Sequence, residues 1–321
     1  MSENNPEDSN LSSNPYSSGT LAIPAPIKPE EKDRPWGPWW SILWAFVVVC
    51  VWQLTQLILV AILAFRDSGK DGISEEGLVT FAENAMADGD SIGIVGFISA
   101  VVGVVMIVFI VRVKGISLAD GLALRKFRKP WMWALLFPTW LAGMFVISII
   151  SNLFAQGNST ADQQGILTMV EGTEYLFLLF LGVSIGAPFF EEFLFRGLLH
   201  EGLRQSFLGR WGSGVVIAAL FSVIHAQYQD PSAFVALFLL GILFTVVREV
   251  TGSLWAAVAI HFIQNTVVTV HMCMLLNGLI PEEYILEDMR GLVPEASVEE
   301  SAEEGPRASE KTFSPEPESS L

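Results

Sequence analysis

The sequence has few charged residues for its length. Only 16% of the 321 residues are charged, whereas 51% are hydrophobic, and the mean hydropathy is +0.48. Soluble domains carry about 25% charged residues, so this composition excludes a soluble globular protein and indicates an integral membrane protein. Basic residues are especially scarce, with 18 Lys and Arg against 34 Asp and Glu, which gives no indication of a nucleic-acid partner.

Cysteine, a signal peptide and internal repeats are also lacking or nearly so. Cys50 and Cys273 lie within apolar runs and have no paired spacing, so neither a disulfide nor a zinc-thiolate site is predicted. The first apolar run begins near Trp39 and is too long for a signal-peptide core. No internal repeat is visible, which disfavours a transporter built from inverted repeats.

Long apolar runs alternate with polar loops along the chain. Runs of about 20 residues cross a bilayer as helices, because the backbone hydrogen bonds are then satisfied within each segment. We therefore predict an all-α, polytopic membrane bundle of about seven transmembrane helices, or eight, with disordered tails. The expected spans are 39–65, 91–113, 131–154, 175–190, 211–226, 232–247 and 254–276.

The polar ends of the chain differ from the apolar middle. The first 35 residues are rich in Ser, Asn, Pro and Glu, and the last 45 hold 12 acidic and 3 basic residues. Such segments bury too little apolar surface to fold, so both are expected to be disordered. The predicted division is a tail at 1–35, transmembrane helices one to three at 36–173, a catalytic core at 174–276 and an acidic tail at 277–321.

The loop charges predict the orientation. No basic residue lies between spans three and four, so the basic loop between spans two and three is placed in the cytoplasm by the positive-inside bias. The N-terminus is then cytoplasmic, in a multi-pass protein of a cytoplasmic or inner membrane. Span four would end near Phe190 at the cytoplasmic side, and residues 193–210 are expected to form a helix that continues into the interface or lies along it. The basic residues of the loop are Arg112, Lys114, Arg125, Lys126, Arg128 and Lys129.

Three apolar segments contain ionisable or amide side chains. An ionised group at bilayer depth costs about 2.5–3.5 kcal/mol on insertion scales, so such residues indicate a functional site. We interpret the three sets as parts of one site. They are Glu191 and Glu192 with Arg196, Phe221 with His225, and His261 with Asn265.

Helical spacing predicts how these side chains are arranged. Residues four apart share a helix face, so Glu192 can reach Arg196 and His261 lies beside Asn265. Neighbours in sequence point about 100° apart, so Glu191 and Glu192 cannot address one point equally. One carboxylate is expected to face the reaction centre while the other pairs with Arg196 or orients its partners.

These residue types favour hydrolysis. A desolvated carboxylate can serve as general base to a water, while an imidazole shares that water or holds a metal. His261 with Asn265 can then donate to an oxyanion on an amide carbonyl. Two His and one Glu (Glu191, His225 and His261) would also suit a zinc site with an open fourth position, although the H-E-x-x-H spacing is absent.

The ordered motifs E-E-x-x-x-R, F-x-x-x-H and H-x-x-x-N resemble those of the CPBP intramembrane protease family, which includes type II CAAX prenyl endopeptidases and bacteriocin-processing or immunity-type proteins. The resemblance covers about 176–270 and implies a helical bundle that cleaves a peptide bond of a membrane-associated protein or peptide, prenylated or otherwise close to the lipid bilayer. Zinc and a metal-free glutamate mechanism both stay open. The resemblance implies a water-activating Glu191 supported by Glu192 and Arg196, a His225 that shares the water or binds metal, and an oxyanion site of His261 and Asn265.

Other interpretations compete with a protease. A Glu192–Arg196 pair alone is often a structural ion pair, and the same fold can serve a non-catalytic immunity-type or scaffolding protein. A proton-coupled carrier could use Glu and His as a relay. Outside the motifs, His200 and His271 are expected to be solvated or packed, and Glu249 to be an interface charge near a bend at Gly252.

Overall fold

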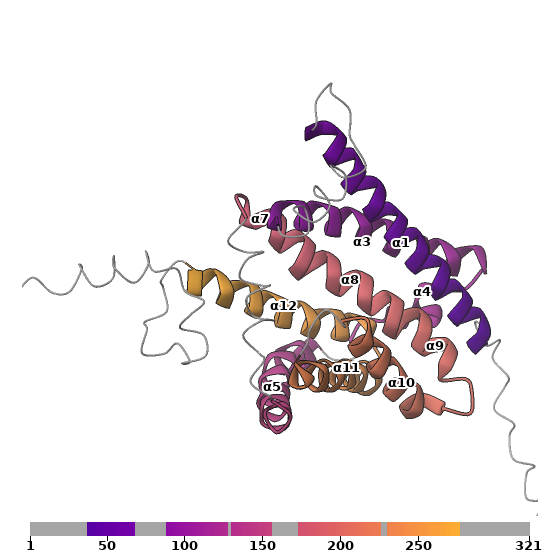
Figure 1. The fold of residues 1–321 in the computed structure, drawn as a ribbon. Coiled ribbons are helices and arrows are strands. Elements are labelled where there is room, and N and C mark those ends of the chain that lie inside the picture. Colours follow the sequence, from indigo (N-terminus) through magenta and orange to yellow (C-terminus); the bar gives the residue numbers. More distant parts are fainter. Residues whose placement is uncertain (1–36, 68–87, 128–129, 156–172, 226–229, 277–321) are drawn as a thin grey trace, which may run out of the picture. The chain divides into compact units, whose positions relative to one another are not determined.

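The computed structural model describes residues 37–67, 88–127, 130–155, 173–225 and 230–276. The predicted disordered tails at 1–35 and 277–321 lie outside these ranges. Every regular element of the described residues is helical (Figure 1). The prediction of an all-α fold is therefore confirmed.

Among the described residues, six helical stretches are long and apolar enough to cross a bilayer, and α10 is a shorter apolar helix. Together they match the predicted seven and make the chain a multi-pass membrane protein. Which side each end faces stays a prediction from the loop charges. Apart from the fourth span, the helices are α1 (Pro38–Asp67), α3 (Gly89–Val113), α4 (Leu118–Gly121), η2 (Pro130–Leu135), α5 (Leu136–Asn152), α10 (Gly209–Val223), α11 (Pro231–Thr251) and α12 (Leu254–Leu276).

The fourth span differs from the prediction. It does not end near Phe190 but continues as one helical stretch from Leu176 to Leu203. Glu191 and Glu192 therefore lie near the middle of the span and not at its end. The stretch consists of α7 (Leu176–Leu179), the π-helix η3 (Phe180–Gly186), α8 (Ala187–Glu192), the π-helix η4 (Phe193–Leu199) and α9 (His200–Leu203).

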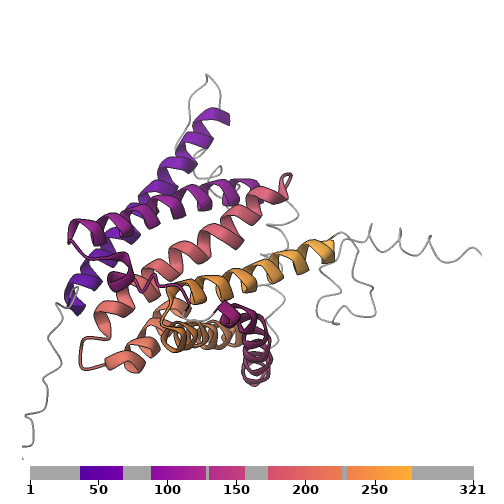
Figure 2. The same cartoon turned by 180° about the vertical axis from the view of Figure 1, so that it is seen from behind.

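This long stretch packs between α3 and α12, and α10 and α11 pack against each other, with α10 also against α9 and α11 against α12 (Figures 1 and 2). Buried residues from α3, α8, α10, α11 and α12 form one apolar cluster, in which Ile107, Ile217 and Phe244 are fully buried. By contrast, many large apolar side chains elsewhere are exposed, such as Leu57 and Phe65 on α1. Exposed apolar helix faces suit a protein whose solvent is lipid.

Glycines allow α3 and η3 to approach closely. A Cβ added at Gly182 would lie 2.5 Å from the carbonyl oxygen of Gly93, and one added at Gly93 would overlap the Leu178 carbonyl. Small residues at helix crossings let membrane helices pack with their backbones in contact. The crossing fixes the N-terminal half of the fourth span, which leads directly to the two glutamates.

Gly93→Ala is expected to destabilise the protein by about 1–3 kcal/mol, because the added methyl group meets rigid backbone. Gly96→Ala is the matched control on the same helix, since its Cβ meets only the Gly182 Cα, at 3.9 Å. Thermal unfolding of both variants in one detergent checks this. Equal melting temperatures for the two variants would contradict the close crossing.

The ends of α11 follow from local sequence. Asp230 caps the helix by accepting a hydrogen bond from the Ser232 backbone N–H at 2.8 Å, and Pro231 occupies the first turn, where no donor is needed. At the other end Gly252 has a φ of +66°, the left-handed conformation that ends a helix. The predicted bend at Gly252 is confirmed, and it turns the chain from α11 into α12.

Candidate active site

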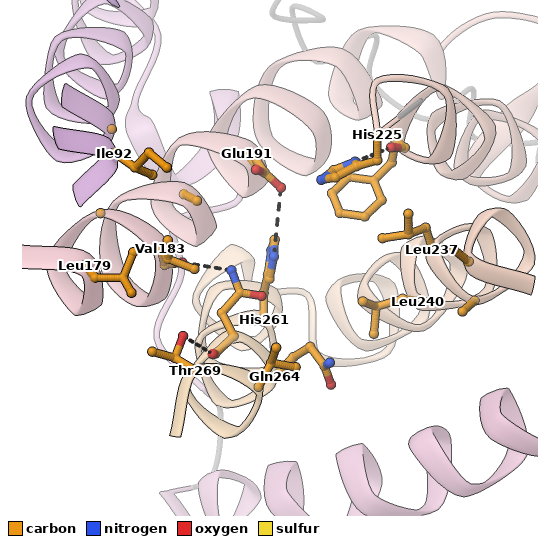
Figure 3. A pocket seen from close by; sticks show the side chains of 18 residues that line it. Ile92, Leu179, Val183, Glu191, His225, Leu237, Leu240, His261, Gln264 and Thr269 are labelled. Atoms are coloured by element: carbon orange, nitrogen blue, oxygen red, sulfur yellow. Dashed lines mark hydrogen bonds and ion pairs between the residues drawn. The ribbon is translucent and has the colours of Figure 1, made fainter. Parts of the chain in front are cut away.

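A cavity of about 490 Å³ lies where α3, the fourth span, α10, α11 and α12 meet (Figure 3). Most of its wall is apolar, which is typical of small-molecule and peptide sites with a few placed polar groups. Four of the six predicted site residues line it, and Glu192 and Arg196 lie behind that wall. The polar side chains of the lining are Glu191, His225, His261, Gln264, Asn265 and Thr269.

The two adjacent glutamates occupy different surroundings. Glu192 is fully buried, and its carboxylate accepts a hydrogen bond from Arg196 at 2.8 Å. The Glu191 side chain is 18% exposed and lines the cavity. This arrangement matches the expectation that one carboxylate faces the cavity while the other pairs with Arg196. π-Helical segments flank the pair on both sides, and such segments are frequent at functional sites.

Arg196 connects η4 to α11. Besides Glu192, its guanidinium donates to the Gly241 carbonyl oxygen at 3.0 Å, and it is fully buried. Its charge lies 4.9 Å from the ring centroid of Phe221 and 5.2 Å from that of Phe244, at cation–π distance. A third ring, that of Phe195, lies 5.8 Å away, so the buried arginine is compensated by a carboxylate, a carbonyl and three aromatic faces.

His261 joins α12 to both glutamates. Its Nδ1 lies 2.9 Å from the same Glu192 oxygen that Arg196 contacts, and its Nε2 lies 3.8 Å from Glu191 (Figure 3). An ionised carboxylate only accepts, so Nδ1 carries the proton of this bond. Phe244 stacks on the imidazole at 4.5 Å between centroids. The ring is therefore held with Nε2 toward the cavity.

His225 is the second residue after α10, which ends at Val223. The backbone N–H groups of Ile224 and His225 bond to Leu220 and Ser222, so neither serves the Phe221 carbonyl. The His225 side chain donates to that carbonyl through Nδ1 at 2.7 Å. In the neutral ring Nε2 then carries the lone pair. The imidazole and the Glu191 carboxylate point toward one another across the cavity (Figure 3).

Asn265 forms a hydrogen bond with the Val183 carbonyl, which receives no backbone N–H at the end of the π-helix. The Ala187 N–H reaches back to Gly182, and the next residue, Pro188, has no N–H to offer the Val183 carbonyl. The Asn265 side-chain amide donates to that carbonyl at 2.8 Å. One proton of the amide therefore ties α12 to η3, and the predicted role of Asn265 at an oxyanion depends on the other.

The segment that contains these site residues is similar to a known protein family. Residues 173–267 match the family model described as type II CAAX prenyl endopeptidase Rce1-like. This segment is Rce1-like. The family predicted from the three motifs is thus confirmed, and the matched segment includes Glu191, His225, His261 and Asn265.

A curated relative carries no functional name. The "Uncharacterized 24.3 kDa protein" of Escherichia coli is 33% identical over 90 residues, which are 28% of this chain and 42% of the relative. The chain thus aligns with less than half of that protein. No solved structure matches the chain significantly.

The sequence left open a three-ligand zinc site within this Rce1-like region. No group of three or more His, Cys, Asp or Glu side chains among the described residues is arranged to share a metal ion. The predicted ligand set of Glu191, His225 and His261 does not fit a metal in this arrangement, so no step below runs through one.

A second buried polar network lies at the end of the Rce1-like helices. His200 bonds to Glu249 at 3.0 Å and to Ser213 at 3.1 Å, while Arg248 contacts Glu249 and lies 2.5 Å from Glu201. His200 was expected to be solvated or packed, and it is packed; Glu249 was expected to be an interface charge, and its side chain is only 4% exposed. Hydropathy could not reveal this because each charge is compensated by a residue distant in sequence.

Proposed function

We propose that this protein is an intramembrane endopeptidase with Glu191 as the water-activating base. The observation that carries the proposal is the Glu191 carboxylate. It lines the cavity, and its Oε2 is buried without a hydrogen-bond partner among the described residues. Buried polar oxygens are rarely left unsatisfied, so this oxygen is suited to bind a water. Two imidazoles from other segments of the chain, those of His225 and His261, line the same cavity.

The chemistry follows from the fixed rings. Glu191 takes a proton from a water that His225 helps to hold through Nε2, and the water oxygen adds to the carbonyl carbon of the scissile bond. As an imidazolium, His261 donates to Glu192 through Nδ1 and to the oxyanion through Nε2, beside the Asn265 amide. Glu191 then gives its proton to the leaving nitrogen as the C–N bond breaks. Glu192 and Arg196 act by holding His261.

The walls of the cavity favour a substrate close to the lipid. Apolar residues from α3 and α11 line it, including Ile92, Leu237 and Leu240. Such a surface suits a peptide with a lipid-modified or strongly apolar segment, and a prenylated CAAX-type protein is one that the family description names.

His225→Ala is expected to abolish substrate processing, whereas His271→Ala is expected to retain it. His271 lies on α12 with an exposed side chain and does not line the cavity. Proteomic comparison of membrane fractions that contain wild-type protein, each variant or Glu191→Ala identifies a peptide cut only when the cavity residues are intact. If all variants accumulate and give identical peptides, the protein is a scaffold and not a protease.

A further inference from the structure

Gln264 is a polar side chain of the cavity that the motifs do not include. It lies three residues after His261 on α12, so both share one face of the helix. Its amide oxygen accepts a hydrogen bond from the Trp140 indole at 2.8 Å. Trp140 belongs to α5, which packs against both α11 and α12.

This bond fixes the orientation of the amide. An indole N–H can only donate, so the oxygen of Gln264 must face Trp140 and the nitrogen must face away from it. Trp140 is only 7% exposed, so the indole is held in place. In Figure 3 the Gln264 side chain extends below Leu240, at the side of the cavity formed by α11.

The other polar side chains of the cavity mostly donate hydrogen bonds within the protein. Asn265 donates to Val183, Thr269 donates to the Asn265 carbonyl, and both histidines donate through Nδ1. The Gln264 amide nitrogen, by contrast, donates to no acceptor among the described residues. An oriented donor in a mostly apolar cavity has a strong preference for a ligand that brings an acceptor.

We propose that Gln264, oriented by Trp140, binds a main-chain carbonyl of the peptide substrate beside the scissile bond. Residues three apart on a helix face are about 5–6 Å apart at Cβ, and one residue of extended peptide spans about 3.3–3.6 Å. The bound carbonyl therefore belongs to a residue within about two positions of the cleaved bond. This inference rests on the proposed endopeptidase function, and it makes Gln264 a substrate-binding residue that selects extended peptides.

A matched pair of variants isolates the amide donor. Trp140→Phe removes the indole N–H but keeps Gln264, whereas Trp140→Phe with Gln264→Leu also removes the amide and leaves no indole unpaired. Both are made in full-length Glu191→Gln protein, so that a bound peptide is not consumed. The probe is a fluorescent peptide with an S-farnesyl cysteine before an apolar tripeptide. In companion probes one carbonyl at a time near the expected cleavage site is replaced by methylene.

The double variant, Trp140→Phe with Gln264→Leu, is expected to bind the full probe about three- to tenfold more weakly than Trp140→Phe alone. This factor is the effect of one neutral hydrogen bond. One companion probe should bind Trp140→Phe protein more weakly by the same factor and bind the double variant as the full probe does. Equal affinities of the two proteins for the full probe, equal losses with every companion, or no binding of any probe would overturn the inference. A probe that binds but is not cut by wild-type protein contradicts the endopeptidase function and leaves the Gln264 result standing.

Discussion

Glu191→Gln is expected to lower the rate of peptide cleavage by about 10²–10⁴-fold, the usual contribution of a general base. An amide keeps the volume of the carboxylate but cannot take a proton from water. Because the Glu191 carboxylate lies 3.8 Å from His261 Nε2 and its Oε2 has no hydrogen-bond partner among the described residues, the substitution should leave the fold intact. The measurement is the single-turnover rate at which purified protein cleaves a substrate that the proteomic comparison of membrane fractions has identified.

The matched control for Glu191 is Glu174→Gln. Glu174 lies just before the fourth span, is exposed and does not line the cavity. The Glu174→Gln variant carries the same chemical change and should cleave the substrate at the wild-type rate. The base assignment fails if Glu191→Gln keeps more than about a tenth of that rate while both variants show wild-type melting temperatures.

The sequence was a good guide to the positions of the spans. Each predicted start lies within two residues of the observed one, from Trp39 against Pro38 in α1 to Leu254 in α12. Length and hydropathy suffice here because a bilayer demands about 20 apolar residues from any helix that crosses it. The motif spacings also found Glu192–Arg196, since residues four apart meet within one helix.

The end of span four could not be found in this way. Hydropathy treats Glu191, Glu192 and Arg196 as polar and ends the run at Phe190. In the structure Arg196 is compensated by Glu192 within its own helix and by Gly241 from α11, so the helix continues to Leu203. The cost of a charge depends on its partners, and those from other helices are invisible to a window along the chain.

The same limit applies to the contacts that orient the site. The bonds from His261 to Glu192 and from Asn265 to Val183 join α12 to the fourth span. The second of these depends on a π-helix that ends before Pro188. The proline is visible in the sequence, but no spacing shows which side chain will bond to the Val183 carbonyl, which the proline leaves without an N–H partner. Gln264 was overlooked for a similar reason, since Trp140 lies on α5.

Arg196→Met is expected to destabilise the protein by about 3–5 kcal/mol, the usual effect of removing one partner of a buried ion pair. Glu192 would keep its hydrogen bond to His261 but lose the guanidinium that contacts it at 2.8 Å in a fully buried position. Cleavage should fall as well, because His261 is oriented by that carboxylate. Denaturant titration in one detergent gives the stability, and the cleavage assay gives the activity.

Glu192→Gln combined with Arg196→Met separates the charge from the hydrogen bond. The amide oxygen that this substitution introduces can still accept from His261 Nδ1, and no unpaired charge is left in the core, so most of the lost stability should return. Activity should not return, since a neutral acceptor stabilises an imidazolium less than a carboxylate does. Recovery of both would mean that the ion pair serves folding alone. Recovery of neither would mean that Arg196 stabilises the bundle chiefly through Gly241 and the aromatic rings of Phe221 and Phe244.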